Sequence, residues 1–340
     1  MDSLSDLTTL HVGGPASALI HAKTEIELIT AVREADASGR PVLILGGGSN
    51  MLVSDQGFPG TVIRIETSGN SYEIDACSGG TVTVAAGVDW DEFVLFTMDK
   101  GLANLESLSG IPGTVGGAPI QNIGAYGHEV SEVIARVRAF DRQKDRITTF
   151  AASDCEFGYR TSKFKTERDR WVILDVTFQL RRGEMSLPIK YAELANALGV
   201  EIGARVPIQQ LRETVLQLRE KKGMLAGLAD PIWSAGSFFI NPIISAEDAA
   251  LLPESAPRWP QPNGRVKTSA AWLLENSGVH KGDRLAGAQF SERHVLALSN
   301  SGGATADDLI ALAKSAREKV LVTFGIRLEA EVQLIGVSLD

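Results

Sequence analysis

The 340-residue sequence predicts an α+β fold that is divided into three domains. Short strands around one amphipathic helix give way near Ser71 to β-rich runs, and these give way near Val206 to long helices. A chain of this length also suffices for two or three domains of about 100–200 residues each. We therefore expect domains at residues 1–66, 67–206 and 207–340.

The first domain contains a helix between short strands. Thr24 and Glu27 have the spacing of a capping box, and Gly39 marks the end of the helical pattern. The predicted apolar face of this helix consists of Ile26, Ile29, Ala31 and Val32. The apolar runs at 41–45 and 60–65 are strand-like, so this part is a small α/β unit.

The second and third domains differ in their element patterns. Strand-like runs in the second occupy 72–76, 80–88, 132–141, 146–150 and 171–180, with one helix at 89–101. Helices are expected in the third at 207–223, 268–278 and 305–325, with strands at 294–300 and 328–337. The predicted core face of the last helix consists of Leu309, Leu312, Ala313, Ala316 and Val320.

Charge and composition exclude several classes of function. A formal charge of -9 and a pI near 5.2 argue against nucleic acid or an anionic membrane as the main partner. We expect a cytoplasmic protein, because no segment has the roughly 20 apolar residues of a membrane span and the first residues do not resemble a signal peptide. Cys77 and Cys155 lack CxxC spacing, so neither a disulfide framework nor a metal site is expected.

Two glycine-rich stretches are candidates for ligand binding. Residues 46–50, GGGSN, follow a buried strand, where consecutive backbone N–H groups can converge on an anion, although a simple tight turn explains them equally well. Residues 107–130 combine several glycines with Pro112, with the amides of Gln121 and Asn122, and with the ring of Tyr126. Because glycine is entropically costly in folded structure, such a concentration predicts a bound ligand.

A third stretch, GSFFINP, places the hydroxyl of Ser237 between a glycine and two phenylalanines. A nucleophilic serine is disfavoured, because there is no GxSxG motif and neither His128 nor His294 has a spacing that suggests a triad. A serine that merely satisfies a turn remains an alternative.

Several motifs together resemble the MurB family of UDP-N-acetylenolpyruvoylglucosamine reductases. They include TTLHVGGPA, LILGGGSNMLVSD, IPGTVGGAPIQNIGAYG, FGYRTSKFK, GSFF and LEAEVQLIG, in the family's order and over almost the whole chain. The resemblance implies that the first two domains form a vanillyl-alcohol-oxidase-like (PCMH-type) FAD-binding unit and that the third is an α/β substrate-binding domain. It also implies that NADPH reduces bound FAD, which then reduces the enolpyruvyl group of UDP-N-acetylglucosamine-enolpyruvate for peptidoglycan synthesis. We expect a monomer whose partners are these two small molecules.

The resemblance assigns the cofactor site to the two glycine-rich stretches. The FAD pyrophosphate is expected over the amides of residues 46–50, and the isoalloxazine near residues 113–126. The implied cofactor-binding residues are Gly46, Gly47, Gly48, Ser49, Asn50, Pro112, Gly113, Thr114, Gly116, Gly117, Gln121, Asn122, Gly124 and Tyr126.

It also assigns the catalytic residues. Hydride addition to the methylene carbon of an enolpyruvate pushes charge onto the neighbouring carbon and the carboxylate, so the reaction needs a cation, a second polar group and a proton donor. The family's motifs give these roles to Arg160, Glu331 and Ser237 respectively. Glu329 shares a strand face with Glu331 under period-two alternation, so only the motif register selects Glu331.

Four substrate-binding residues follow from the same motifs. They are Tyr159, Tyr191, Lys222 and Asn241. Tyr191 lies in an insert near 183–195 that is typical of the long-loop, type I form, whereas Lys222 and Asn241 are expected to contact the diphosphate or sugar. Tyr191 could instead be a packing residue at a helix start, and Lys222 a solvated helix end. The sequence after Lys222, KGMLAGLADP, departs from the family pattern KLPDP, so the aim of this lysine is open.

Two other functions remain compatible with the residues. A different FAD enzyme, such as an oxidase of a hydroxy acid or alcohol, would react rapidly with oxygen and would not need Ser237. A non-catalytic nucleotide- or sugar-binding protein would stay colourless after FAD is added.

Overall fold

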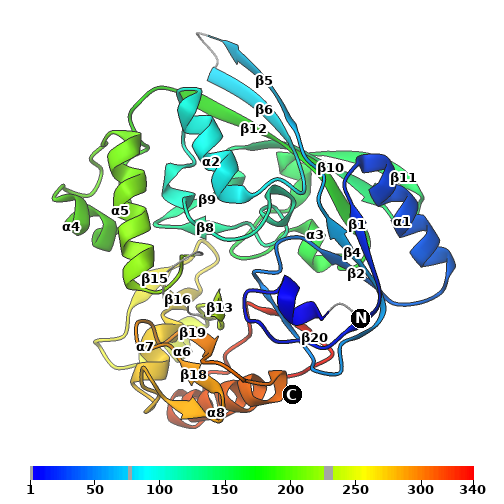
Figure 1. Ribbon diagram of the computed structural model, residues 1–340. Coiled ribbons are helices and arrows are strands. Elements are labelled where there is room, and N and C mark those ends of the chain that lie inside the picture. The colour runs from blue at the N-terminus through cyan, green and yellow to red at the C-terminus, as the bar shows by residue number, and fades with distance from the viewer. Residues whose placement is uncertain (1–2, 76–78, 226–232) are drawn as a thin grey trace. The chain divides into compact units, whose positions relative to one another are not determined.

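The computed structural model describes residues 3–75, 79–225 and 233–340, which form two compact units. Unit 1 comprises Met1–Pro15, Gly48–Phe58 and Leu228–Asp340, and unit 2 comprises Ala16–Gly47 and Pro59–Gly227. Both units contain helices and sheets, as Figure 1 shows, which confirms the α+β class. The two units do not coincide with the expected boundaries at 66 and 206, and the three-domain division stays a prediction. Cys77 and most of the divergent stretch after Lys222 lie outside the described residues.

Unit 2 begins with the predicted α/β unit. Its three-stranded sheet has the order β1-β4-β2, made of Ala16–Ala22, Phe58–Ile65 and Val42–Leu45. Helix α1, Glu25–Ala37, starts at the predicted capping box of Thr24 and Glu27. The predicted apolar face is confirmed at Ala31 and Val32 but wrong at Ile26, which is 79% exposed, because the buried stripe begins at Leu28. That stripe consists of Leu28, Ala31, Val32 and Ala35.

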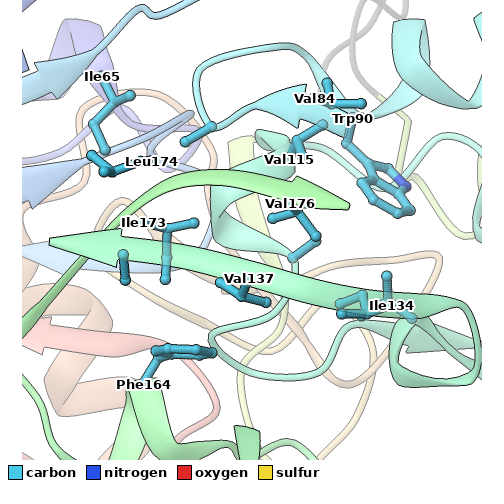
Figure 2. Packing of buried hydrophobic residues seen from close by; sticks show 14 of the residues in the cluster. Ile65, Val84, Trp90, Val115, Ile134, Val137, Phe164, Ile173, Leu174 and Val176 are labelled. Atoms are coloured by element: carbon cyan, nitrogen blue, oxygen red, sulfur yellow. The ribbon is translucent and has the colours of Figure 1, made fainter. Parts of the chain in front are cut away.

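A larger antiparallel sheet forms the rest of the core of unit 2. Its strand order is β11-β10-β12-β6-β5, with β7 on a second part of β12. These strands are β5 Asn70–Asp75, β6 Gly79–Ala85, β7 Leu102–Ala103, β10 Ile134–Asp141, β11 Arg146–Ala151 and β12 Trp171–Arg182. Figure 2 shows how β-branched side chains of β10 and β12, such as Val137 and Val176, pack in one cluster with Trp90. This cluster supports the loops that carry the predicted cofactor residues.

Shorter elements and four more α-helices complete the described part of unit 2. They are α2 Trp90–Asp99, η2 Glu106–Leu108, η3 Val115–Gly117, β8 Gly124–Ala125, β9 His128–Glu129, η4 Val130–Glu132, η5 Ala152–Cys155, α3 Lys163–Thr166, α4 Ala192–Leu198 and α5 Ile208–Lys221. The long α5, predicted from sequence, packs beside α4 through Leu211, Val215 and Leu218 (Figure 1). The insert near 183–195 therefore leads into a short helix.

Unit 1 is built from small sheets around one long helix. Its sheets have the orders β13-β19-β18-β17, β14-β16-β15 and β20-β3. The elements are η1 Leu4–Leu7, β3 Met51–Val53, β13 Trp233–Ser237, β14 Ile243–Ile244, α6 Ala246–Leu251, β15 Arg258–Pro260, β16 Val266–Thr268, α7 Ala270–Glu275, β17 Arg284–Leu285, β18 Ala288–Phe290, β19 Ala297–Asn300, α8 Ala306–Phe324 and β20 Gln333–Ile335. The predicted core face of α8 is confirmed, since all five of its residues are buried. The predicted strand at 328–337 is much shorter, because only β20 has regular pairing.

Candidate active site

The predicted site residues are divided between the two units. Unit 1 contains Gly48, Ser49, Asn50, Ser237, Asn241 and Glu331. Unit 2 contains Gly46, Gly47, Pro112, Gly113, Thr114, Gly116, Gly117, Gln121, Asn122, Gly124, Tyr126, Tyr159, Arg160, Tyr191 and Lys222.

In unit 1, main-chain hydrogen bonds place Glu331 beside the segment of Ser237. The N–H of Glu331 donates to the carbonyl of Phe238 over 2.8 Å, and the N–H of Ile240 donates to the carbonyl of Glu329 over 3.0 Å. These bonds flank an isolated antiparallel bridge centred on Phe239 and Ala330. Glu331 thus lies opposite the residue that follows Ser237.

Burial distinguishes the two glutamates on either side of this bridge, which the sequence pattern left equivalent. Glu329 is exposed, whereas Glu331 is partly buried. A partly desolvated carboxyl group can act in a site with strong electrostatic fields, whereas an exposed one is screened by water. Burial therefore favours Glu331, in agreement with the motif register.

Ser237 ends strand β13 at a firmly anchored position. The next two residues, Phe238 and Phe239, are each 1% exposed, with their rings 5.1 Å apart in an edge-on arrangement. The N–H of Phe238 donates to the carbonyl of Leu296, and Gly236 has a φ of +73°, which few other residues adopt. The phenylalanines hold the loop while Ser237 itself stays partly exposed.

Asn50 connects the glycine-rich loop of unit 1 to the same segment. Its side-chain N–H donates to the carbonyl of Glu331 over 3.3 Å, and its own carbonyl accepts from the N–H of Gln333 over 3.0 Å. The strands that follow, β3 and β20, then run parallel. Within unit 1 the structure therefore brings together Asn50, Glu331 and the segment of Ser237.

Asn241 has a structural contact that the sequence did not reveal. Its side-chain oxygen accepts a hydrogen bond of 2.9 Å from the N–H of Ala270, the first residue of α7. The oxygen therefore satisfies one of the N–H groups that a helix start leaves without an intrahelical partner. A ligand contact by Asn241 would fall to its NH₂ group.

In unit 2, the ends of two glycine-rich segments touch each other. A Cβ at Gly46 would lie 2.7 Å from the Oγ1 atom of Thr114, and one at Gly47 would lie 2.8 Å from the Cα atom of Gly113. Both distances are shorter than real Cβ atoms show, so side chains are excluded here. Bare backbone in such a place can approach a pyrophosphate closely and present its N–H groups, which fits the demands of FAD.

The loop that carries Gly113 is fixed to the start of α2. The carbonyl of Gly113 accepts from the N–H of Trp90, and the N–H groups of Val115 and Gly116 donate to the carbonyls of Val88 and Ala86. The loop is therefore ordered by main-chain bonds, so its glycines hold one conformation. This arrangement suits a rigid ligand surface.

Asn122 acts as an internal brace. Its side-chain NH₂ donates to the Oε2 atom of Glu129 over 2.7 Å and to the carbonyl of Gly158 over 3.1 Å, and its Oδ1 atom accepts from the N–H of Ser131. The residue is 1% exposed. Its side chain thus ties the loop of the predicted cofactor residues to the turn that precedes Arg160.

Arg160 is held in an unusual backbone conformation. Its φ is +53°, its Nη2 group donates to the carbonyl of Gly124 over 2.8 Å, and its guanidinium lies over the ring of Tyr159 at 5.4 Å. A Cβ at position 124 would lie 3.1 Å from the Nη1 atom of Arg160. Gly124 therefore makes room for the guanidinium, and the strained backbone suggests a functional constraint.

A cluster of side chains lies beside α4 and α5. We call it the Lys222 cluster, and it consists of Tyr126, Tyr191, Glu193 and Lys222. The Nζ atom of Lys222 lies 2.6 Å from Glu193 and 5.8 Å from the ring centre of Tyr126, and the two tyrosine rings are 5.9 Å apart. Burial raises the pKa of Tyr126 to about 12, an effect that Arg219 opposes and Glu193 reinforces. Lys222 is therefore part of an ion pair, in contrast to the solvated helix end that remained an alternative.

Two further polar residues near this cluster were not predicted. Arg219 donates to the carbonyls of Gly110 and Met224, and burial lowers the pKa of its guanidinium. Glu106 is 2% exposed, accepts from the N–H of Asn104, and has its pKa raised by burial. It lines a small cavity with Tyr126 and His128. Arg219 begins the RxxK motif that ends at Lys222, so this motif could have drawn attention to it.

No group of three or more His, Cys, Asp or Glu side chains among residues 3–75, 79–225 and 233–340 is arranged to hold a metal ion. Within the same residues, no helix has both the length and the apolar character required to cross a membrane.

Comparison with family models gives two matches. Residues 16–150 match an FAD binding domain, and residues 228–335 match the C-terminal domain of UDP-N-acetylenolpyruvoylglucosamine reductase. The first match contains both glycine-rich stretches and the second contains Ser237 and Glu331.

Whole-chain relatives carry the same name. The chain is 53% identical to the UDP-N-acetylenolpyruvoylglucosamine reductase of Cutibacterium acnes, over 99% of this chain and 90% of that one. It is 49% identical to the enzyme of Thermobifida fusca, over 99% and 97% of the two chains. Among solved structures, it resembles UDP-N-acetylenolpyruvylglucosamine reductase (MurB) from Thermus caldophilus, with a TM-score of 0.67, 27% identity and coverage of 98% and 97%.

Proposed function

This chain belongs to the UDP-N-acetylenolpyruvoylglucosamine reductase family, and from that premise we propose which of its residues carry out each part of the reaction. The protein is an FAD-dependent oxidoreductase of peptidoglycan synthesis that uses NADPH to reduce UDP-N-acetylglucosamine-enolpyruvate to UDP-N-acetylmuramate. FAD held by the glycine-rich segments would supply the redox chemistry, namely hydride transfer from NADPH to the methylene carbon of the enolpyruvyl group.

Ser237 and Glu331 act on the carbanion that hydride transfer to the substrate produces. Ser237 donates a proton from its Oγ atom to the carbon next to the carboxylate, and it needs no activating base because the carbanion is itself strongly basic. Glu331, protonated or hydrogen-bonded, stabilises the enediolate, since an ionised carboxylate would oppose the developing charge. The observation that carries this assignment is the bridge in which Glu331 bonds to the carbonyl of Phe238, directly after Ser237.

Arg160 binds the carboxylate of the enolpyruvyl group. Its planar guanidinium can hold a carboxylate with two hydrogen bonds. The bond to Gly124 and the stacking on Tyr159 pre-orient it, which reduces the entropy lost on binding. Tyr159 contacts the substrate as well.

The remaining residues bind the nucleotide parts of the ligands. Lys222 and Asn241 contact the diphosphate or sugar of the substrate, and Tyr191, 44% exposed at the start of α4, closes over the nucleotide. The cofactor is held by the glycine-rich segments 46–50 and 112–117 and by Gln121, Asn122, Gly124 and Tyr126. For Gly46 and Gly47 the support is the lack of room for any side chain.

The finer organisation of the protein is also part of this proposal. We assign the FAD-binding subdomains to residues 1–66 and 67–206 and the substrate-binding domain to residues 207–340. The enzyme works as a monomer in the cytoplasm, where NADPH and UDP-sugars are available. Its charge of -9 supports small-molecule partners over nucleic acid.

Anaerobic stopped-flow measurement of the two half-reactions tests the proposal. In the FAD-loaded protein, Ser237→Ala should leave flavin reduction by NADPH close to wild type and slow reoxidation by the enolpyruvyl substrate by roughly 10²–10⁴-fold, the usual range of general acid catalysis. An equal fall in both half-reactions would refute the proton-donor role. Rapid reoxidation by oxygen without any response to the enolpyruvyl substrate would refute the reductase function.

A further inference from the structure

The Lys222 cluster contains a carboxylate that the reaction does not require. Glu193 lies in the first turn of α4, two residues after Tyr191, and its Oε2 atom is 2.6 Å from the Nζ atom of Lys222. Both residues belong to unit 2. The ammonium that is assigned to the substrate diphosphate is therefore neutralised when no ligand is bound.

The ion pair is partly shielded from water. The side chain of Lys222 is 28% exposed and that of Glu193 is 38% exposed, while the ammonium also lies 5.8 Å from the ring centre of Tyr126, which is 9% exposed. A pair in such a setting is screened less than one on the open surface, and the face of an aromatic ring adds a further attraction for the cation. Breaking the pair has a real cost.

A phosphate group can replace the carboxylate. Like the carboxylate, it offers negatively charged oxygen atoms to the ammonium, and Glu193 is exposed enough to return to water once it is released. The affinity for a diphosphate ligand then reflects the difference between two similar interactions. Without Glu193, the ligand would gain the full interaction with Lys222.

We propose that Glu193 is a positioning residue that holds Lys222 over Tyr126 as a displaceable counter-ion and thereby weakens the binding of diphosphate ligands. This inference rests on the proposed contact between Lys222 and the substrate diphosphate. Its consequence is faster product release, because NADP+ and UDP-N-acetylmuramate both carry a diphosphate and both have to dissociate in every turnover. A free lysine at this position would hold such products longer.

Titration of the FAD-loaded enzyme with UDP, followed calorimetrically, tests the inference in a double-mutant cycle. Glu193→Gln should bind UDP about threefold to tenfold more tightly than wild type, as expected for loss of one partly exposed competing ion pair. Lys222→Gln should bind UDP more weakly. In the Lys222→Gln background, Glu193→Gln should change the affinity by less than about twofold, because no ammonium remains to be released.

Two controls separate the pair from general charge and from structure. Glu213→Gln removes an equal charge from an exposed position on α5 and should leave UDP affinity unchanged. Glu193→Asp retains the charge on a shorter side chain, so its affinity for UDP should lie between those of wild type and Glu193→Gln. The gain in affinity of Glu193→Gln should shrink as salt is added.

The outcomes distinguish the inference from the function on which it rests. If Lys222→Gln weakens UDP binding but Glu193→Gln leaves it unchanged or weakens it, the counter-ion role is overturned while the substrate contact of Lys222 stands. If Lys222→Gln has no effect on UDP binding, the substrate contact itself is wrong. A gain in affinity that persists in the Lys222→Gln background also overturns the inference.

Discussion

Different kinds of bonds hold the functional residues of the two units in place. Those residues are Ser237 and Glu331 in unit 1, and Arg160 and Lys222 in unit 2. In unit 1, main-chain N–H and carbonyl groups of Phe238, Ile240 and Glu331 make the bridge. In unit 2, the functional side chains themselves bond to Gly124 and Glu193. Replacing the side chain of Glu331 retains these main-chain bonds, whereas replacing that of Arg160 or Lys222 releases its partner.

The strongest test of this difference in unit 1 is Glu331→Gln. It removes the acid but retains the main-chain bonds that place the residue, so reoxidation of the flavin by the enolpyruvyl substrate should slow by roughly 10²–10³-fold, as when one electrostatic contact to a transition state is lost. The thermal unfolding midpoint should stay within about 2 °C of wild type. Stopped-flow absorbance and differential scanning calorimetry give the two values.

Glu329→Gln is the matched control, because Glu329 belongs to the same bridge but is exposed. It should leave both values unchanged. A larger kinetic loss for Glu329→Gln than for Glu331→Gln would mean that the motif register and the burial argument selected the wrong glutamate.

Much of the fold could be predicted from local sequence signals. Thr24 and Glu27 fix the start of α1 through short-range hydrogen bonds, and the spacing of Leu309, Ala313 and Val320 gives the buried face of α8. Such features depend on neighbours within a few turns of chain. Ile26 shows the limit, because its neighbours made it look like a core residue although no other element covers it.

The parts of the site that could not be predicted depend on tertiary contacts. Lys222 and Glu193 are 29 positions apart, and their pairing requires α4 and α5 to pack side by side. Nothing in the sequence near either residue specifies that pairing. The bridge that places Glu331 beside Phe238 likewise joins residues about 90 positions apart. Burial distinguishes Glu331 from Glu329, whereas period-two alternation treats both glutamates alike.

Gly47→Ala tests how tightly the glycine-rich segments of unit 2 are packed. The added Cβ would lie 2.8 Å from the Cα atom of Gly113. Because its nearest neighbours are all backbone atoms of Gly113, one of the two segments has to shift. We expect a loss of about 1–3 kcal/mol in the free energy of unfolding of the apoprotein, typical of overpacking, and less FAD retained per chain. Urea unfolding and the absorbance ratio of flavin to protein measure these effects.

Gly117→Ala provides the comparison in the other glycine-rich segment of unit 2, residues 112–117. Its added Cβ would lie 3.8 Å from the Oγ1 atom of Thr114, an ordinary contact, so the free energy of unfolding should change by less than about 1 kcal/mol. Equal losses for the two variants would show that the contact between Gly47 and Gly113 is not what limits this region.

The smallest expected effect concerns Asn241, a residue of unit 1 whose side chain also supports the fold. Asn241→Ala should lower the stability of unit 1 by about 1 kcal/mol, as for other lost helix-start acceptors, and should also weaken UDP binding. Asn241→Asp retains the acceptor for Ala270, so the urea midpoint should recover, yet its negative charge should keep UDP binding weak because it replaces the NH₂ donor. If Asn241→Asp recovers both properties, Asn241 supports α7 only and has no contact with the nucleotide. If neither variant changes UDP binding, Asn241 has no contact with the substrate. The residues whose side chains both bind the substrate and bond to their own unit would then all lie in unit 2.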